Sequence, residues 1–158
     1  MFDQVDRVLY DLKYNKASRR IITNIYNHAD LSEMALYPCA YSMTFNVSGN
    51  RLCAILNQRS NDMLVANNWN VAQYALLVMM MAQVSGLEPG EFVHVIADAH
   101  IYDRHIPIVR KIIQNEQKPA PKLILDPDIK DFYQFTKNSF KLENYEYTDL
   151  DEKIPVAE

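Results

Sequence analysis

The fold is decided by residues 39–59, which read Cys39-Ala-Tyr-Ser-Met-Thr-Phe-Asn-Val-Ser-Gly-Asn-Arg-Leu-Cys-Ala-Ile-Leu-Asn-Gln-Arg59. Apolar and polar side chains alternate on both sides of Ser48-Gly49-Asn50, three residues that favour turns. Alternation with a period of two is typical of a strand with one buried face, and a glycine-containing loop of three residues commonly joins two such strands. The stretch therefore predicts a β-hairpin whose apolar residues share one face.

The register of this hairpin decides which reactive side chains lie next to each other. If Val47 pairs with Arg51, the pairing continues along both strands until Cys39 lies opposite Arg59. A cation beside a thiol favours the thiolate, which is the nucleophilic form of cysteine. A β-bulge would shift the register by one residue. On this register the hairpin predicts a reactive cysteine next to a guanidinium group.

Composition limits the class of protein. The chain has 158 residues, of which 49% are hydrophobic and 23% charged, and its net charge is −4. These values are ordinary for a soluble globular protein, and we expect residues 1–158 to form a single domain. A net negative charge argues against a broad basic face for nucleic acid. Two cysteines make no disulfide framework, and no apolar signal segment begins the chain, so we expect a reducing cytoplasm.

A long helix is predicted after the hairpin. From Val71 to Ser85 the sequence has no charged residue and is apolar nearly all round, which is typical of a helix buried at the centre of a fold. Asn67 and Asn68 are N-cap candidates, and Gly86 is placed to end the helix. Several amide side chains within and before the helix argue against a membrane span.

The remaining pattern predicts an α+β fold, in which a twisted, mixed or antiparallel sheet carries the hairpin and the long helix packs across it. The other expected elements are a helix over 2–15, a strand over 21–26, a short helix from Asp30 to Leu36 with a capping box, a strand over 91–96 that extends to 102, a helix over 103–115 with Ile108, Val109, Ile112 and Ile113 inward, a strand over 123–125 and short strands within 131–147.

Two polar groups near the hairpin have more than one interpretation. Residues 58–62 place a guanidinium, a hydroxyl, two amides and a carboxylate together, which suits anion recognition but also an exposed loop. Arg19 and Arg20 precede a predicted strand, where adjacent residues point to opposite faces. On pattern alone, solvated surface charges are the favoured interpretation of both arginines.

Two further polar groups are also open to two interpretations. Asn70, near the start of the long helix, can read a nucleobase edge with a donor and an acceptor, or it can cap the helix. Asp98, His100 and Tyr102 share one side of a predicted strand, where they line either a pocket or an exposed face. The histidines and cysteines show no HExxH or CxxC spacing, and the three glycines form no phosphate-binding loop, so no metal is predicted.

Six ordered blocks of the sequence run from near the first residue to the last. They are Ser18-Arg19-Arg20-Ile21-Ile22, Met34-Ala35-Leu36-Tyr37-Pro38-Cys39, Gln58-Arg59-Ser60-Asn61-Asp62, Asn70-Val71-Ala72-Gln73-Tyr74, His100-Ile101-Tyr102 and Pro155-Val156-Ala157. In this order the blocks resemble the folate-dependent, cysteine-nucleophile thymidylate synthase family.

The resemblance implies a role for each matching residue. It implies that Cys39, Arg59 and Asp62 are catalytic residues, and that the Cys39 sulfur adds to C6 of the uracil ring of dUMP. The implied dUMP ligands are Arg19 and Arg20 from the neighbouring subunit, Arg59 and Ser60 at the phosphate, Asn70 at the O4 and N3 edge of uracil, His100 and Tyr102 at the 3′-hydroxyl of deoxyribose, together with Gln58 and Asp62. The implied folate-binding residues are Asp62, between nucleotide and folate, and Ala157 in the C-terminal tail.

The resemblance also implies substrates and partners. The co-substrate is 5,10-methylenetetrahydrofolate, no metal is needed, and the protein is a homodimer with shared sites and no membrane contact. The family's N-terminal part has no counterpart in this sequence, so the chain resembles the C-terminal portion. We therefore expect little activity from the chain alone, because a proton-transfer group typically contributes ~10²–10⁴-fold to a rate. Two alternatives remain: a pyrimidine nucleotide hydroxymethylase of the same family, and a truncated, non-catalytic nucleotide-binding homodimer.

Overall fold

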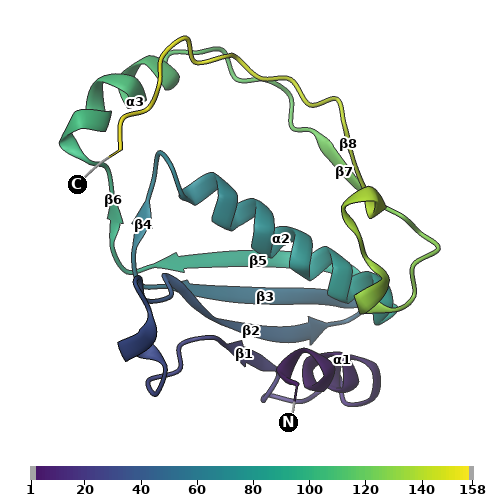
Figure 1. The fold of residues 1–158 in the computed structure, drawn as a ribbon. Helices are drawn as coiled ribbons and strands as arrows, with labels where there is room; N and C mark the ends of the chain where they lie inside the picture. Colours follow the sequence, from purple (N-terminus) through teal and green to yellow (C-terminus); the bar gives the residue numbers. More distant parts are fainter. Residues whose placement is uncertain (1–2, 157–158) are drawn as a thin grey trace.

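A four-stranded mixed sheet forms the base of the computed structural model, which describes residues 3–156 (Figure 1). The strand order is β1-β2-β3-β5. β1 (Ile22–Asn24), β2 (Ala40–Ser48) and β3 (Arg51–Gln58) pair antiparallel, and β5 (Glu88–Ile96) runs parallel to β3. One long helix, α2 (Asn67–Val84), lies across one face of this sheet. The predicted α+β class, with a long helix on a mixed sheet, is confirmed.

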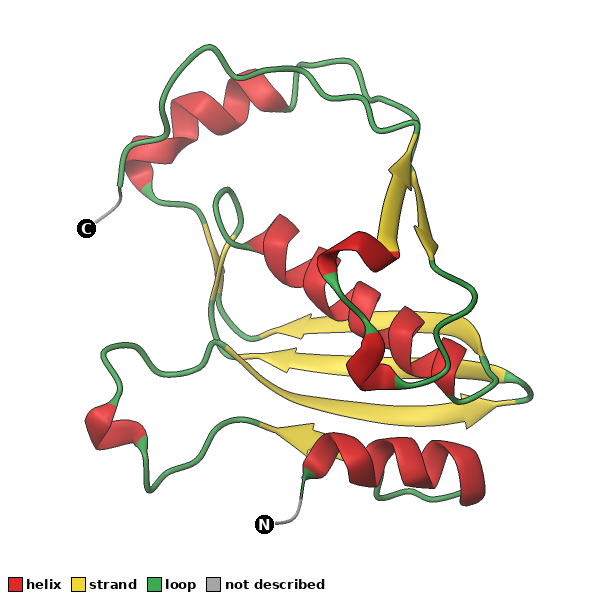
Figure 2. Ribbon diagram, turned by 45° about the vertical axis from the view of Figure 1, so that its right-hand side comes forward, coloured by secondary structure: helices red, strands yellow, loops and turns green. Residues whose placement is uncertain are grey.

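The rest of the chain surrounds this base. The N-terminal helix lies along β1, and the chain after β5 arches over α2 before it ends near α3 (Figure 2). Two small sheets accompany it, a parallel pair of β4 with β6 and an antiparallel pair of β7 with β8. The remaining elements are α1 (Gln4–Tyr14), η1 (Leu31–Glu33), β4 (Asn61–Asp62), β6 (Ala99–His100), η2 (Asp103–His105), α3 (Ile106–Ile112), β7 (Lys122–Leu125), η3 (Phe132–Gln134), η4 (Lys137–Ser139) and β8 (Phe140–Glu143).

The hairpin turn is one residue shorter than predicted. Ser48 pairs with Arg51 and Val47 with Leu52, so the loop is the two residues Gly49-Asn50 and the predicted Val47–Arg51 pair is wrong. Gly49 has a φ of 62°, the sign that a type II′ turn requires at its first central residue. Two-residue turns of this kind match the twist of the strands that they join, which explains the shorter loop.

A β-bulge compensates for the short turn. Between Ala40 and Ser42 the register of β2 against β3 shifts by one residue, so that Ala40 pairs with Gln58. The next backbone contact is a 2.9 Å hydrogen bond from Arg59 N to Cys39 O. The predicted juxtaposition of Cys39 and Arg59 is therefore present, although the turn and the bulge that produce it were not both predicted.

Apolar side chains from the sheet and α2 form the core. The inward faces of β2 and β3 supply Met43, Phe45, Leu52 and Leu56, each at most 1% exposed, and the second half of α2 packs on them. The helix ends as predicted at Gly86, whose φ is 68°. Its first half is less buried than predicted, however, and Trp69 is 77% exposed.

Several local predictions differ from the structure. The N-cap of α2 is Ala66 without a side-chain hydrogen bond, because the Asn67 side chain instead accepts one from Asn61. Asp30 starts only the 3₁₀ turn η1 and makes no capping bond, so the predicted helix to Leu36 is wrong. The remaining corrections concern boundaries: β5 ends at Ile96 before the separate β6, α3 ends at Ile112 with Ile113 73% exposed, and within 131–147 only Phe140–Glu143 is a strand. Among residues 3–156, no helix combines the length and the apolar character needed to cross a bilayer.

Candidate active site

Cys39 and Arg59 meet at the open end of the hairpin. The Arg59 side chain places Nη2 3.6 Å from Cys39 Sγ. Both residues are half-buried, so the sulfur is in contact with a cation and also accessible. The other cysteine, Cys53, lies inside β3 and accepts a 3.4 Å hydrogen bond from Glu91 N. Of the two cysteines, Cys39 is thus the one whose sulfur contacts a positively charged side chain.

Backbone carbonyl groups hold the Arg59 guanidinium in place. Arg59 Nη2 donates to Tyr37 O at 2.7 Å, and Nε donates to Pro38 O at 3.0 Å. Within residues 3–156, Nη1 has no hydrogen-bond acceptor. Arg59 also borders a hollow of about 430 Å³ with Tyr26, His28 and neighbouring residues of β1 and β2. One edge of the guanidinium is thus fixed beside the thiol, and the other is available to an anion.

A partly buried row of side chains joins β5, β3 and α2. Gln58 is 2% exposed; its Nε2 donates to Asn70 Oδ1 at 2.8 Å and to Ser60 O at 2.9 Å, and its Oε1 lies 2.8 Å from His94 Nε2. Burial lowers the pKa of His94 from its ordinary value. Sequence reasoning missed His94, although the alternation of β5 puts it on the same side as Phe92 and Ile96, facing the helix.

Asp98, His100 and Tyr102 form a cluster at the end of β5, but not along one continuous strand. His100 Nδ1 lies 3.6 Å from Asp98 Oδ2, and the rings of His100 and Tyr102 meet edge to face with centroids 5.1 Å apart. The short pairing of β4 with β6 aligns Asp62 with His100. Of these three residues, Tyr102 borders the hollow that also contains Asp62, whereas the Asp98 side chain is 69% exposed.

The carboxylate of Asp62 borders a hollow closed by the C-terminal segment. Its side chain, 17% exposed, lies 4.0 Å from Nδ1 of His105, which is fully buried. Two hydrogen bonds hold the C-terminal segment in place. One joins His105 Nε2 and Pro155 O at 2.8 Å, and in the other Arg104 Nη1 donates to Val156 O at 2.7 Å. The hollow has a volume of about 330 Å³ and mixes this carboxylate with apolar walls. Sequence reasoning missed His105, because only the fold brings it to residue 155.

Two predicted site residues lie away from Cys39. Arg19 and Arg20 are exposed and directly precede Ile21, whose carbonyl accepts a hydrogen bond from Phe45 N. Phe45 is six positions beyond Cys39 in the sequence, a distance of roughly 20 Å along an extended strand. The two arginines therefore do not reach the Cys39 region of their own subunit. Ala157 lies outside the described residues.

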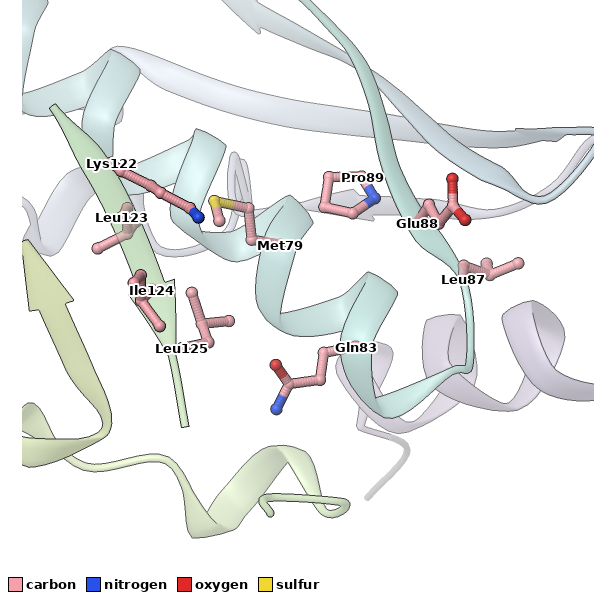
Figure 3. Close-up of a pocket in the computed structure, with 9 residues that line it drawn as sticks. All are labelled: Met79, Gln83, Leu87, Glu88, Pro89, Lys122, Leu123, Ile124 and Leu125. Carbon is pink, nitrogen blue, oxygen red and sulfur yellow. The ribbon is translucent and has the colours of Figure 1, made fainter. Parts of the chain in front are cut away.

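A third hollow, of about 420 Å³, lies apart from these groups between the end of α2 and β7 (Figure 3). Gln83 borders it and donates to Asp126 O and Ile129 O, so its amide is occupied in holding the loop after β7. Met79, Leu87, Pro89 and β7 supply mostly apolar walls. Among residues 3–156, no group of three or more histidine, cysteine or acidic side chains is arranged to hold a metal ion. The edge of the sheet at Cys39 is thus the better candidate for chemistry.

Comparison with known proteins gives one consistent result. A family model described as thymidylate synthase matches residues 1–157. Thymidylate synthase of Bacillus phage phi3T is 46% identical over 147 residues, 93% of this chain and 53% of that protein. Thymidylate synthase 1 of Bacillus amyloliquefaciens is 46% identical over 155 residues, 98% of this chain and 67% of that protein.

A solved structure agrees with the sequence comparisons. Thermostable thymidylate synthase A from Bacillus subtilis superposes with a TM-score of 0.91 at 45% identity, covering 94% of this chain and 53% of that one. The chain spans about half the length of several curated relatives that it matches. Because the family model covers almost every residue, this chain belongs to the thymidylate synthase family.

Proposed function

We propose that this chain carries the nucleotide-binding half of a thymidylate synthase site and takes part in the reductive methylation of dUMP to dTMP. The observation that carries the proposal is the 3.6 Å contact between Cys39 Sγ and the Arg59 guanidinium. A thiolate stabilised there is suited to attack an electron-poor ring carbon. The family and the hollow beside Asp62 support the choice of reaction.

In the proposed mechanism Cys39 adds to C6 of the uracil ring. The new S–C bond makes C5 an enolate-like carbon, which attacks the one-carbon unit. The co-substrate 5,10-methylenetetrahydrofolate supplies that unit and the hydride, and leaves as dihydrofolate. In this sequence of steps the C5 proton leaves before the hydride is transferred to the one-carbon unit, and expulsion of Cys39 as the thiolate then gives dTMP. Arg59 stabilises the negative charge on the sulfur before the addition and again when the thiolate is released.

The binding roles follow from the chemistry of each group. The free edge of Arg59, with Ser60, is proposed to bind the phosphate, and Asn70 the O4 and N3 edge of the base. His100 and Tyr102, whose rings are in contact, are proposed to bind the 3′-hydroxyl of deoxyribose. We assign Gln58 to the base site because it holds the Asn70 amide.

Asp62 is proposed to face both substrates, because its carboxylate lines the hollow closed by residues 154–156. This hollow suits the flat ring of a reduced folate, since apolar walls contact the ring faces while a carboxylate accepts ring N–H groups. Ala157 follows directly in the sequence, and we propose that it takes part in binding the folate. No metal is assigned to this site.

A homodimer is part of the proposal. Cross-strand pairing places Ile22, Thr44, Ile55 and Val93 in one row on the face of the sheet opposite α2. Ile22, Ile55 and Val93 are 49%, 40% and 40% exposed, an unusual degree of exposure for neighbouring apolar residues. A second copy of the chain would cover this face. It would also bring in the arginine pair at residues 19–20, which cannot reach the Cys39 region of its own subunit. The two free cysteines agree with a cytoplasmic setting.

The proposal is tested with 5-fluoro-dUMP, whose C5 fluorine cannot leave as a proton does, so that the covalent adduct accumulates. The chain is incubated with this nucleotide and 5,10-methylenetetrahydrofolate, and the modified peptide is identified by mass spectrometry. We expect an adduct on the peptide with Cys39, its loss in Cys39→Ser and its retention in the matched control Cys53→Ser. An adduct that survives Cys39→Ser, or no adduct in any variant, would overturn the proposal.

A further inference from the structure

The donors and acceptors in the row His94–Gln58–Asn70 can be assigned from one backbone group. Ser60 O is a carbonyl oxygen and can only accept a hydrogen bond, so the Gln58 atom 2.9 Å away must be its amide nitrogen. The same nitrogen reaches Asn70, which therefore presents its oxygen at 2.8 Å. Gln58 Oε1 then faces His94 Nε2, which must carry a proton. The single carbonyl of Ser60 thus identifies which atoms of Gln58, Asn70 and His94 are donors and which are acceptors.

This direction decides which atoms Asn70 offers to a ligand. Its Oδ1 already accepts one hydrogen bond from Gln58, and its Nδ2 has no acceptor within residues 3–156. An amide that turns its NH₂ group outward donates to a carbonyl oxygen, and its oxygen can still accept a ring N–H. The 4-carbonyl pyrimidine uracil fits this arrangement. The 4-amino group of cytosine would place a donor against a donor.

His94 is the third anchor of the row. It contributes its Nε2–H to the only Gln58 atom that Ser60 and Asn70 leave free. Its ring is stacked on Phe92, with centroids 6.2 Å apart and planes inclined by 30°, which fixes the direction of the N–H. Without that donor, the buried Gln58 Oε1 would lack a partner, and the cost of a buried unpaired acceptor would favour rotation of the amide.

We propose that His94 is a positioning residue for base selection: by holding Gln58, it keeps the NH₂ of Asn70 toward the nucleotide and so favours a 4-carbonyl over a 4-amino pyrimidine. The inference rests on the proposed function, because it assumes that Asn70 faces the base of dUMP. His94 itself makes no contact with the ligand in this scheme, and it acts only through Gln58.

Two variants of equal size separate a donor from an acceptor at this position. His94→Gln keeps an N–H near the place of Nε2, whereas His94→Glu puts a carboxylate oxygen against Gln58 Oε1. Binding of dUMP and of dCMP is measured for each by calorimetry, and the ratio of the two dissociation constants is compared. We expect His94→Gln to stay within about twofold of the wild type and His94→Glu to lose at least about fivefold of its preference for dUMP.

A measurement on the unsubstituted protein keeps the test decisive if His94→Glu does not fold. Long-range ¹⁵N–¹H NMR spectra of the imidazole distinguish the two tautomers of His94, and we expect the proton on Nε2. A proton on Nδ1, or an unchanged preference for dUMP in folded His94→Glu, would overturn the inference. The proposed function would still stand in that case, provided that the wild type binds dUMP. A wild type that binds neither nucleotide, or does not prefer dUMP, would overturn the proposed function and the inference together.

Discussion

Replacing Arg59 tests whether its charge activates Cys39. At the 3.6 Å between Arg59 Nη2 and Cys39 Sγ, two unit charges attract by about 1.2 kcal/mol in bulk water and by about 4.6 kcal/mol at an effective dielectric constant of about 20. Both side chains are half-buried, so water screens the pair and the lower value applies. That value corresponds to about a sevenfold change in the rate of a reaction that depends on this attraction.

Two substitutions separate charge from hydrogen bonding. Arg59→Gln keeps amide donors for the carbonyl groups of Tyr37 and Pro38 but removes the charge, whereas Arg59→Lys keeps the charge and loses the fork of donors. We expect Arg59→Gln to slow alkylation of Cys39 by iodoacetamide at pH 7 about sevenfold, and Arg59→Lys to slow it less.

Mass spectrometry of the two cysteine peptides measures this rate with an internal control. Cys53 lies within β3, and its alkylation should be the same in all variants, because only unfolding would expose it further. The reasoning is refuted if Arg59→Gln leaves the Cys39 rate within twofold of the wild type while circular dichroism shows an intact fold. A parallel rise in both cysteine rates would instead identify unfolding as the cause.

Three further predictions concern the sheet. Val95→Asp places a charge on the open face, where Val95 is 47% exposed, and we expect light scattering to find a monomer in place of a dimer; an unchanged dimer mass would contradict the proposed interface. Gly90→Ala would bring a Cβ within 2.7 Å of Cys53 Sγ and 2.8 Å of Leu52 O, so we expect urea unfolding to show a loss of about 1–3 kcal/mol; adding Cys53→Ala should restore little, since the carbonyl remains. Burial lowers the pKa of His94, so the unfolded chain binds its proton first as the pH falls, and stability should decrease below about pH 6.5, the ordinary histidine value. His94→Gln should reduce that decrease between pH 7.5 and 5.5, and an identical pH profile would refute this assignment.

The hairpin shows how far alternation can predict a fold. The period of two correctly assigned the inward residues Met43, Phe45, Leu52 and Leu56, because burial of one face leaves little freedom in which residues face the core. Alternation does not determine loop length, since Ser48-Gly49-Asn50 is compatible with a loop of two or three residues. The bulge next to Tyr41 leaves no mark in the sequence either, so the juxtaposition of Cys39 and Arg59 was correct although its assumed register was not.

Contacts between distant segments were beyond the sequence pattern. The sequence pattern indicates only that His94 belongs to an alternating strand. Its contact with Gln58 depends on the pairing of β5 with β3 in the fold. His105 and Pro155 are even further apart in the chain. The exposed first half of α2 was also unpredictable, because a helix that is apolar nearly all round indicates a need for burial but not which segment provides it.

The direction of the strands explains why the candidate groups gather at one edge of the sheet. β3 and β5 run parallel, with Gln58 paired to Ile96, so the residues that follow both strands leave at the same edge (Figure 1). β2 is antiparallel to β3, and its beginning, next to Cys39, therefore lies at this edge as well. β4 and β6 continue the two parallel strands as a second parallel pair, which sets Asp62 beside His100 before α2 starts. One parallel crossover through α2 thus brings a thiol, a cation, two amides and a carboxylate to one edge of the sheet from three separate parts of the sequence, which is why the family's blocks are scattered along the chain while these groups gather at one edge.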